Sequence, residues 1–286
     1  MNRLPISVSI IAGAEAARIG RALESVADWT SEIIVVVNDD VRDGTDEVAR
    51  RHGARVFREP WKGYLAQKTS AAKKTSQEWI LGLDADEVVS PGLREEIQRL
   101  FAEKHPLEVY AAFSLPRLTM FCGRWIQHGD WYPDRTTRLW HRDCAEWGGI
   151  DPHARLNVRG RTGRLRQDLL HYNAAGIDDQ ITKIIAYSDD FQRDALQHRR
   201  PATWLDLALR PGWRFFRAFF LRLGFLDGWQ GYYLAWMTAA YTLTRYAKVR
   251  EAGATTLTPG PGQSPKTAED KGRLDQGREV GRPHTL

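Results

Sequence analysis

Two aspartates at the end of an apolar run are the strongest chemical signal in this sequence. Asp84 and Asp86 are separated by one alanine and follow the apolar run 79–83, within the stretch WILGLDADEVV. A charged side chain near a core has to be paired or bound to a metal. Carboxylate oxygens suit a hard divalent cation such as Mg²⁺ or Mn²⁺, which completes its shell with phosphate oxygens. The pair is therefore either a metal–diphosphate site or a cap for the following helix, because Asp and Glu also favour helix starts.

The elements that would position this pair alternate between strand and helix. Short β-branched runs predict four strands, at 6–11, 33–37, 55–57 and 79–83. Helical spacing of apolar residues lies between them, which together predicts an α/β fold: a Rossmann-like, mostly parallel sheet with flanking helices. Ligands of such sheets bind outside the carboxyl ends of the strands, and Asp84 and Asp86 lie at one of those ends.

The rest of the chain differs in character. The stretch 116–173 is rich in Trp, Gly, Arg and His and has poor periodicity, so we expect loops and edge strands of an acceptor cleft. The stretch 177–250 is helical, and Arg210, Arg214 and Arg217 share one helical face with phenylalanines on the other. That pattern is typical of a basic amphipathic helix at a membrane surface.

Composition excludes several classes of protein. The two cysteines of this 286-residue chain rule out a disulfide-rich scaffold, and no His or Cys pair has zinc-type spacing. The 11 Trp fit sugar stacking or a membrane interface, and the net charge of +5 fits phosphorylated molecules or anionic lipid. Because the C-terminal arginines mingle with Phe and Leu, we expect a lipid surface and no nucleic acid. The N-terminus lacks the features of a signal peptide, so the catalytic part is expected in the cytoplasm.

At this point the sequence resembles a known family. Four segments follow, in order and spacing, the family 2 glycosyltransferases with a GT-A fold: SVSIIAGAEAARIGRALESV, EIIVVVNDDVRDGTDEVARRHGARV, WKGYLAQKTSAA and WILGLDADEV. Four later segments resemble the lipopolysaccharide core glycosyltransferases of the bacterial inner membrane's cytoplasmic face: GRWIQHGDWYPD, TRLW, GRLRQDLLHY and GFLDGWQG.

The resemblance implies a domain organisation. A GT-A nucleotide-diphospho-sugar transferase domain would cover 1–175, with the nucleotide-sugar half at 1–115 and the acceptor half at 116–175. A helical, membrane-associating region would follow at 176–250, and a disordered tail at 251–286. The uncharged run 228–244 is at the short limit for a spanning helix, and its Tyr, Gln and Thr favour a buried or interfacial helix. Peripheral attachment to the inner membrane is therefore expected.

The resemblance also implies an activity, namely inverting transfer of a hexose or heptose. The donor would be a nucleotide-sugar and the acceptor a lipid-linked saccharide, namely the lipopolysaccharide inner core. A divalent cation, Mg²⁺ or Mn²⁺, at Asp84 and Asp86 would neutralise charge on the leaving diphosphate. Two alternatives stay open: a polyprenyl-phosphate or other cell-envelope glycosyltransferase, and a catalytically impaired nucleotide-sugar-binding protein.

Several residues match family positions near the nucleotide. Glu15 matches a contact to the nucleoside, and Gln67 and Lys68 match a short Gln-Lys motif. Arg138 is placed for a phosphate contact, since its fixed charge suits one. Asn38 stands where the family usually has an Asp that reads the base, and its amide oxygen can still accept a hydrogen bond from a base N–H.

The general base is less clear from the resemblance. Related sequences often have an acidic residue after a histidine, but here His153 is followed by Ala154. Asp151, Asp134 and His153 are the replacement candidates, since each can take a proton. Each can equally serve as a loop hydrogen-bonding residue. The change at residue 154 also motivates the impaired-enzyme alternative.

Overall fold

The structure, a computed structural model, describes residues 3–151, 153–172 and 176–255, with side chains at all of them except 150, 153, 254 and 255. The chain forms two compact units. The first consists of Met1–Gln127 and Trp131–Asn173, and the second of His128–Asp130 and Ala174–Leu286. A three-residue segment from the first half of the sequence therefore belongs to the C-terminal unit.

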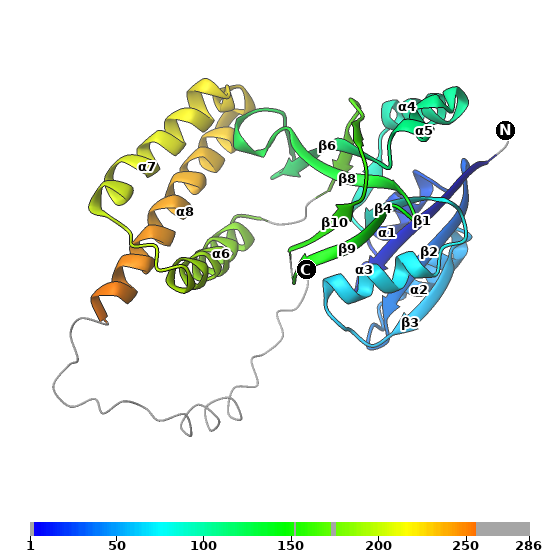
Figure 1. The fold of residues 1–286 in the computed structure, drawn as a ribbon, viewed down its shortest axis with the longest axis horizontal. Helices are drawn as coiled ribbons and strands as arrows, with labels where there is room; N and C mark the ends of the chain where they lie inside the picture. Colours follow the sequence, from blue (N-terminus) through cyan, green and yellow to red (C-terminus); the bar gives the residue numbers. More distant parts are fainter. Residues whose placement is uncertain (1–2, 152, 173–175, 256–286) are drawn as a thin grey trace, which may run out of the picture. The chain divides into compact units, whose positions relative to one another are not determined.

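A sheet of ten strands, counted over the described residues, forms the middle of the first unit (Figure 1). Its N-terminal strands are β1 (Leu4–Ala12), β2 (Thr30–Asn38), β3 (Arg55–Glu59) and β4 (Trp79–Asp84), which run parallel in the order β3-β2-β1-β4. Ile6 and Val8 on β1 are fully buried, and so is Ser7 on the opposite face. Burial of both faces is typical of parallel strands covered by helices. The prediction of these four strands is confirmed.

Helices connect and follow these strands: α1 (Ile19–Glu24), α2 (Thr45–Arg51), α3 (Tyr64–Lys73), α4 (Pro91–Glu103) and α5 (His105–Val109). Helix α4 is the one that follows Asp84 and Asp86 in the sequence. Its cap is Ser90, whose Oγ accepts a hydrogen bond from the backbone N–H of Leu93 at 3.1 Å. The alternative that Asp84 and Asp86 cap the next helix is therefore wrong.

Two strands that lie wholly or partly in the Trp-rich stretch 116–173 are inside the same sheet. Strand β8 (Asp134–His141) pairs antiparallel with β4 and with β6 (Ala112–Phe121). Four short strands complete the sheet: β5 (Glu87–Val89), β7 (Arg124–Ile126), β11 (Thr162–Arg164) and β12 (Leu169–His171). The expectation of loops and edge strands is wrong for β6 and β8. Charged side chains such as Arg138, which is only 5% exposed, interrupt the apolar pattern that normally marks a buried strand.

A separate antiparallel hairpin, β9 (Ala145–Ile150) and β10 (His153–Val158), contacts α3. Trp147 on β9 packs edge-on against Trp140 of β8, with ring centroids 5.7 Å apart. Trp140 in turn lies over Gly82 of β4, where a Cβ would come within 2.8 Å of the indole ring. Glycine at 82 therefore lets this aromatic pair pack directly on the strand that ends in Asp84.

In the described residues the second unit is helical. It contains α6 (Ile177–Gln197), α7 (Trp204–Phe216), the π turn η2 (Arg217–Leu221), the 3₁₀ turn η3 (Gly224–Asp227) and α8 (Gly228–Thr255). Helix α8 packs against both α6 and α7 (Figure 1). The expected C-terminal helical region is confirmed, and α8 continues through the first five residues of the tail predicted from 251; the remainder of that tail lies outside the described residues. Within the described ranges, no helix combines the length and the apolar character that a membrane crossing requires.

Candidate active site

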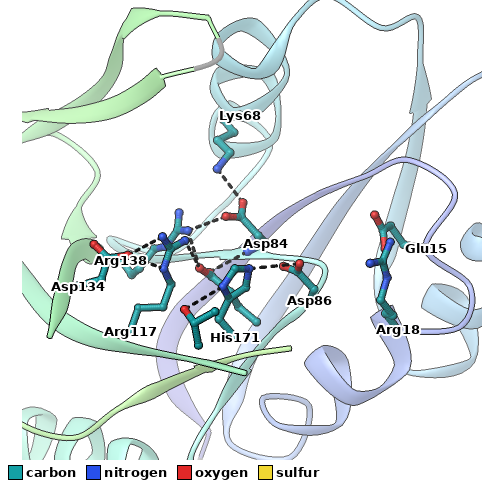
Figure 2. Close-up of polar contacts among 11 residues, drawn as sticks. Glu15, Arg18, Lys68, Asp84, Asp86, Arg117, Asp134, Arg138 and His171 are labelled. Atoms are coloured by element: carbon teal, nitrogen blue, oxygen red, sulfur yellow. Dashed lines mark hydrogen bonds and ion pairs between the residues drawn. The ribbon is translucent and has the colours of Figure 1, made fainter. Parts of the chain in front are cut away.

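Asp84 lies where β4 emerges from the sheet and is held by two cations (Figure 2). Lys68 Nζ on α3 is 2.6 Å from its Oδ1, and Arg138 Nη2 on β8 is 2.6 Å from its Oδ2. The structure therefore brings together three of the predicted nucleotide-binding residues. They come from three different elements, which meet at the carboxyl end of β4.

Glu87, on β5, is a site residue that the sequence did not indicate. It is fully buried, and its Oε1 accepts hydrogen bonds from Arg138 Nη2 at 2.7 Å and from Arg117 Nη1 at 3.4 Å. Its Oε2 accepts the backbone N–H of Asp84 at 3.1 Å. Glu87 thus fixes both the backbone of Asp84 and the guanidinium that binds it. Its place three residues after Asp84 was the only sequence signal.

Arg117 extends the contacts to Asp134, one of the predicted general bases. Its Nε and Nη2 lie 3.0 and 2.5 Å from Asp134 Oδ2. The connected set of Lys68, Arg117, Arg138, Asp84, Glu87 and Asp134 is called the Asp84 network below. It contains three cations and three carboxylates, so it is electrically balanced.

Opposite charges within the network fix the charge states of Asp84 and Arg138. Burial alone would raise the pKa of Asp84, but the charges of Arg138 and Lys68 hold that pKa well below its usual range. Burial alone would lower the pKa of Arg138, but Asp84 and Glu87 raise it above its usual range. Both groups therefore stay charged throughout the physiological pH range.

Asp86 faces a different partner. Its Oδ2 is 3.3 Å from Nε2 of His171, on β12, and His171 Nδ1 is 3.2 Å from Thr119 Oγ1 on β6. Both side chains keep some exposure, 24% for Asp86 and 17% for His171. The sequence did not predict this pair, because 85 residues separate the two positions. A histidine that binds a metal usually has its second ring nitrogen oriented by a hydrogen-bond partner, as Thr119 orients Nδ1 of His171.

The described residues contain no group of three or more His, Cys, Asp or Glu side chains arranged to hold a metal ion. The fit of a divalent cation therefore depends on Asp86 and His171 together with oxygens from a ligand. Asp84 is less open to a cation, because both of its oxygens already contact Lys68 and Arg138. Carboxylate and phosphate oxygens suit Mg²⁺ or Mn²⁺, whereas an imidazole ligand such as His171 is more usual for zinc or iron.

Glu15, after β1, pairs with Arg18 at 2.7 Å, to one side of Asp86 in Figure 2. Burial raises the pKa of Glu15 and the charge of Arg18 opposes that shift, while the charge of Asp86 adds to it. Glu15 and Asp86 therefore lie close enough for their charges to interact. The predicted nucleoside contact and the predicted metal ligand belong to one edge of the sheet.

Gln67 and Asn38 form the remaining predicted pair. Gln67 is fully buried, and its Nε2 donates to Asn38 Oδ1 at 3.4 Å. Its Oε1 is buried and has no hydrogen-bond partner within the described part of the chain. An unsatisfied buried acceptor is costly, so this oxygen is available to a donor on a ligand.

The other two candidate bases lie on the β9–β10 hairpin. Asp151 Oδ1 accepts the backbone N–H of Leu65 at 2.7 Å, at the start of α3. Gly63 at this turn has φ +91°, and a Cβ there would come 1.9 Å from Asp151 Oδ2. Asp151 therefore closes the turn before α3. The backbone of His153 pairs with Ile150 in β9, and its side chain lies outside the described residues.

Comparison with known proteins finds a matching family and relatives that are named as glycosyltransferases. Residues 7–160 match the model of a family described as glycosyl transferase family 2. An uncharacterized glycosyltransferase of Rickettsia felis is 31% identical over 262 residues, which cover 86% of this chain and 90% of that protein. The lipopolysaccharide core biosynthesis glycosyltransferase LpsC of Rhizobium meliloti is 27% identical over 259 residues, covering 86% of this chain and 94% of that protein.

Among solved structures, S. aureus TarS 1–349 has a TM-score of 0.44 and 14% identity, covering 90% of this chain and 92% of that chain. The family match spans the strands and helices that carry Glu15, Asn38, Lys68, Asp84 and Arg138. It confirms the resemblance read from the sequence motifs, and with the mixed sheet and flanking helices it confirms the GT-A fold class. The chain is a glycosyltransferase and belongs to glycosyltransferase family 2.

Proposed function

We propose that this protein transfers a sugar, with inversion, from a nucleotide-sugar donor to a lipid-linked saccharide of the lipopolysaccharide inner core. The observation that carries the proposal is the arrangement at the end of β4. A balanced network holds Asp84, and a carboxylate–imidazole pair, Asp86 and His171, lies beside it. The name of the Rhizobium meliloti relative, lipopolysaccharide core biosynthesis glycosyltransferase LpsC, supports the choice of acceptor.

The charge balance supports a requirement for a cation. A sugar diphosphate brings negative charge to an edge where the Asp84 network is already neutral and Asp86 adds a further carboxylate. A divalent cation held by Asp86 and His171 would supply the missing positive charge, and as a Lewis acid it would stabilise the leaving diphosphate. Lys68 and Arg138 are the two network cations that contact Asp84, and they would turn from it toward phosphate oxygens.

The other predicted residues of this edge would position the nucleoside. Gln67 Oε1, which has no partner among the described residues, would accept a hydrogen bond from a base N–H. Asn38, bound to the same Gln67, can accept another. Glu15 would contact the nucleoside from the end of β1.

Asp134 is the stronger candidate for the general base. It belongs to the Asp84 network and its side chain is 44% exposed, so an acceptor hydroxyl can reach it. Asp151 is occupied by the turn before α3. Attack by the activated hydroxyl on the face opposite the diphosphate would invert the anomeric carbon.

The second unit would hold the enzyme at the cytoplasmic face of the bacterial inner membrane. Trp204 and Leu209 on α7 are each 65% exposed, and Trp213 on the same helix is 56% exposed. Exposed aromatic and aliphatic side chains on an amphipathic helix are typical of an interfacial helix. A lipid-linked acceptor would be presented at that surface.

Isothermal titration with UDP- and ADP-sugars, with and without Mn²⁺, tests donor binding, and mass spectrometry of a core-oligosaccharide acceptor tests transfer. The proposal expects cation-dependent binding of one donor and a glycosylated product. Binding without product on any acceptor would instead support the impaired nucleotide-sugar binder that Asn38 and Ala154 motivate. Product on polyprenyl phosphate alone would support the other alternative. If the Asp86→Asn variant transfers sugar as fast as the wild-type protein, the proposed requirement for a cation is wrong.

A further inference from the structure

Three arginines of the second unit share one carboxylate. Arg217 Nη2 is 2.7 Å from Asp130 Oδ1, and Arg214 Nη2 is 3.1 Å from Asp130 Oδ2. Arg222 Nε approaches the same Oδ1 at 3.7 Å. Arg214, Arg217 and Arg222 are called the arginine cluster below. Asp130 is 8% exposed, whereas the arginines are 36%, 31% and 44% exposed.

A π turn brings these arginines to one side. The backbone N–H of Arg222 donates to the carbonyl of Arg217 at 2.8 Å, which is the i to i+5 bond of a π turn. In a regular α-helix, residues five apart point in clearly different directions, because each residue turns the chain by about 100°. The wider turn over η2 brings residue 222 back toward the face of residue 217. Both guanidinium groups can therefore reach Asp130.

The backbone around the cluster is tightly packed. Gly129 donates its N–H to the carbonyl of Arg222 at 2.8 Å, and His128 donates its N–H to Asp227 Oδ2 at 2.8 Å. A Cβ on Gly231 of α8 would come 1.9 Å from the carbonyl oxygen of Gly224 in η3. The arginine cluster is thus fixed to a close-packed support.

The cluster carries surplus positive charge. Asp130 is the only carboxylate within ion-pair distance of the three arginines among the described residues. A fourth arginine, Arg245 of α8, contacts the rings of Phe191, Tyr241 and Tyr246 at 4.7–5.1 Å, and it has no carboxylate partner in the described part of the chain. Burial lowers the pKa of Arg214, and although Asp130 opposes that shift, the charges of Arg217, Arg245 and Arg222 add to it.

The same helical segment carries apolar side chains that are exposed to solvent. Trp213 and Phe216 on α7 and Phe220 on η2 are 56%, 45% and 48% exposed. Arginine forks bind phosphate oxygens in a bidentate way, and aromatic side chains favour the boundary between headgroups and acyl chains. The combination fits a phosphate that belongs to a lipid better than a phosphate free in water.

We propose that the arginine cluster binds the phosphate group of an anionic membrane lipid, with Asp130 holding the guanidinium groups in position. The inference rests on the proposed function, because it names the headgroup chemistry by which the second unit attaches to the bilayer. It differs from a general attraction between basic protein and anionic surface. A defined site depends on which arginines are present, and a general attraction depends only on how many there are.

The test compares two triple variants of the full chain that lose the same charge. R214Q/R217Q/R222Q removes the cluster, and R193Q/R200Q/R250Q removes three arginines from exposed positions elsewhere in the same unit. Co-sedimentation is measured with vesicles of phosphatidylcholine alone and with added phosphatidylglycerol. The cluster variant should lose at least about tenfold in partition onto phosphatidylglycerol vesicles, and the control less than about threefold. Equal losses in the two variants would overturn the proposal.

Two further measurements make the result specific. R214K/R217K/R222K keeps the charge and lacks the forks, so it should bind phosphatidylglycerol vesicles more weakly than the wild-type protein; equal binding would overturn the defined site. Thermal unfolding shows whether the glutamine variant folds, and if it does not, the lysine variant still tests the proposal. Inorganic phosphate titrated onto the vesicle-free protein should bind far more weakly than the vesicles do. Tight binding of free phosphate would overturn the assignment to a lipid.

Failure of this inference can be told from failure of the proposed function. Donor binding at the Asp84 and Asp86 edge is measured in the same cluster variant and should equal that of the wild-type protein. If transfer occurs but the cluster variant binds vesicles normally, only the lipid-phosphate site is wrong. If the cluster binds phosphatidylglycerol and no acceptor is glycosylated, only the proposed function is wrong.

Discussion

Replacing Glu87 by Gln should strongly destabilise the first unit, although the two side chains have almost the same shape. Glu87 is fully buried and uses both oxygens, Oε1 for Arg138 and Arg117 and Oε2 for the backbone N–H of Asp84. Glutamine has a single acceptor oxygen, so its NH₂ group would face one of these donors. The change also leaves a buried guanidinium short of a counter-charge.

Removing one partner of a buried ion pair costs about 3–5 kcal/mol. Arg138 keeps Asp84, and Arg117 keeps Asp134, so we expect the lower end of that range, about 3 kcal/mol of unfolding free energy. Hydrogen exchange measured by mass spectrometry reports on the first unit separately from the second. Peptides from β4 and β8 should open about 150-fold more often in the variant.

The matched control is Glu59→Gln. Glu59 also contacts two lysines, Lys62 at 2.6 Å and Lys74 at 2.5 Å, but lies at the rim of the sheet with lysines that are 44% and 24% exposed. Water can solvate those lysines after the change, so the cost should stay below about 1 kcal/mol. If Glu87→Gln and Glu59→Gln cost the same, burial is not what makes the Asp84 network sensitive to charge.

Three further predictions concern catalysis and pH. Asp86→Asn should raise the Mn²⁺ concentration needed for donor binding by about tenfold or more while leaving thermal unfolding nearly unchanged, and calorimetric titration of the metal measures this. Asp134→Asn should lower kcat by at least about a hundredfold with little change in donor affinity. Asp151→Asn should instead mainly lower the melting temperature. If Asp151→Asn lowers kcat and Asp134→Asn does not, the general base is Asp151. Burial raises the pKa of Glu59, but the hydrogen bonds from Lys62 and Lys74 hold that pKa below its usual value, so the stabilisation by Glu59 is complete above the unfolded value of 4.5 and is lost as the pH falls below it. The unfolding free energies of wild-type protein and Glu59→Gln should therefore converge in that acidic range, as urea titrations at several pH values would reveal.

The parts of the fold that could be predicted from the sequence are those stabilised by apolar burial alone. Strands β1, β2 and β4 have nearly continuous β-branched or aliphatic runs, because both faces are covered. Strand β8 is equally interior but contains Arg138, and β6 contains Arg117. Arg138 is buried and Arg117 is half-buried, because carboxylates elsewhere in the sequence neutralise them. A single sequence does not display such pairing, so the two strands resembled loops.

The candidate site also contains residues that the sequence indicates and residues that it does not. Asp84 and Asp86 could be recognised because they follow a strand and lie together in the sequence. Asp84 could not be assigned its two cations, since Arg138 lies 54 residues away. Glu87 resembled part of a helix start, although the chain forms the short strand β5 there and α4 begins only at Pro91. His171 reaches Asp86 through strand pairing of β12 with β5 and β6, a long-range register that local pattern does not encode.

The assignment of His128–Asp130 to the second unit affects any attempt to divide the protein. The chain leaves the first unit after Gln127, contributes three residues to the second, and re-enters the first at Trp131. A fragment that begins at 174 would keep every arginine of the cluster and lose the carboxylate between them. Its like charges would then repel at close range, so separating the two units by a single cut should yield a C-terminal piece that folds poorly on its own.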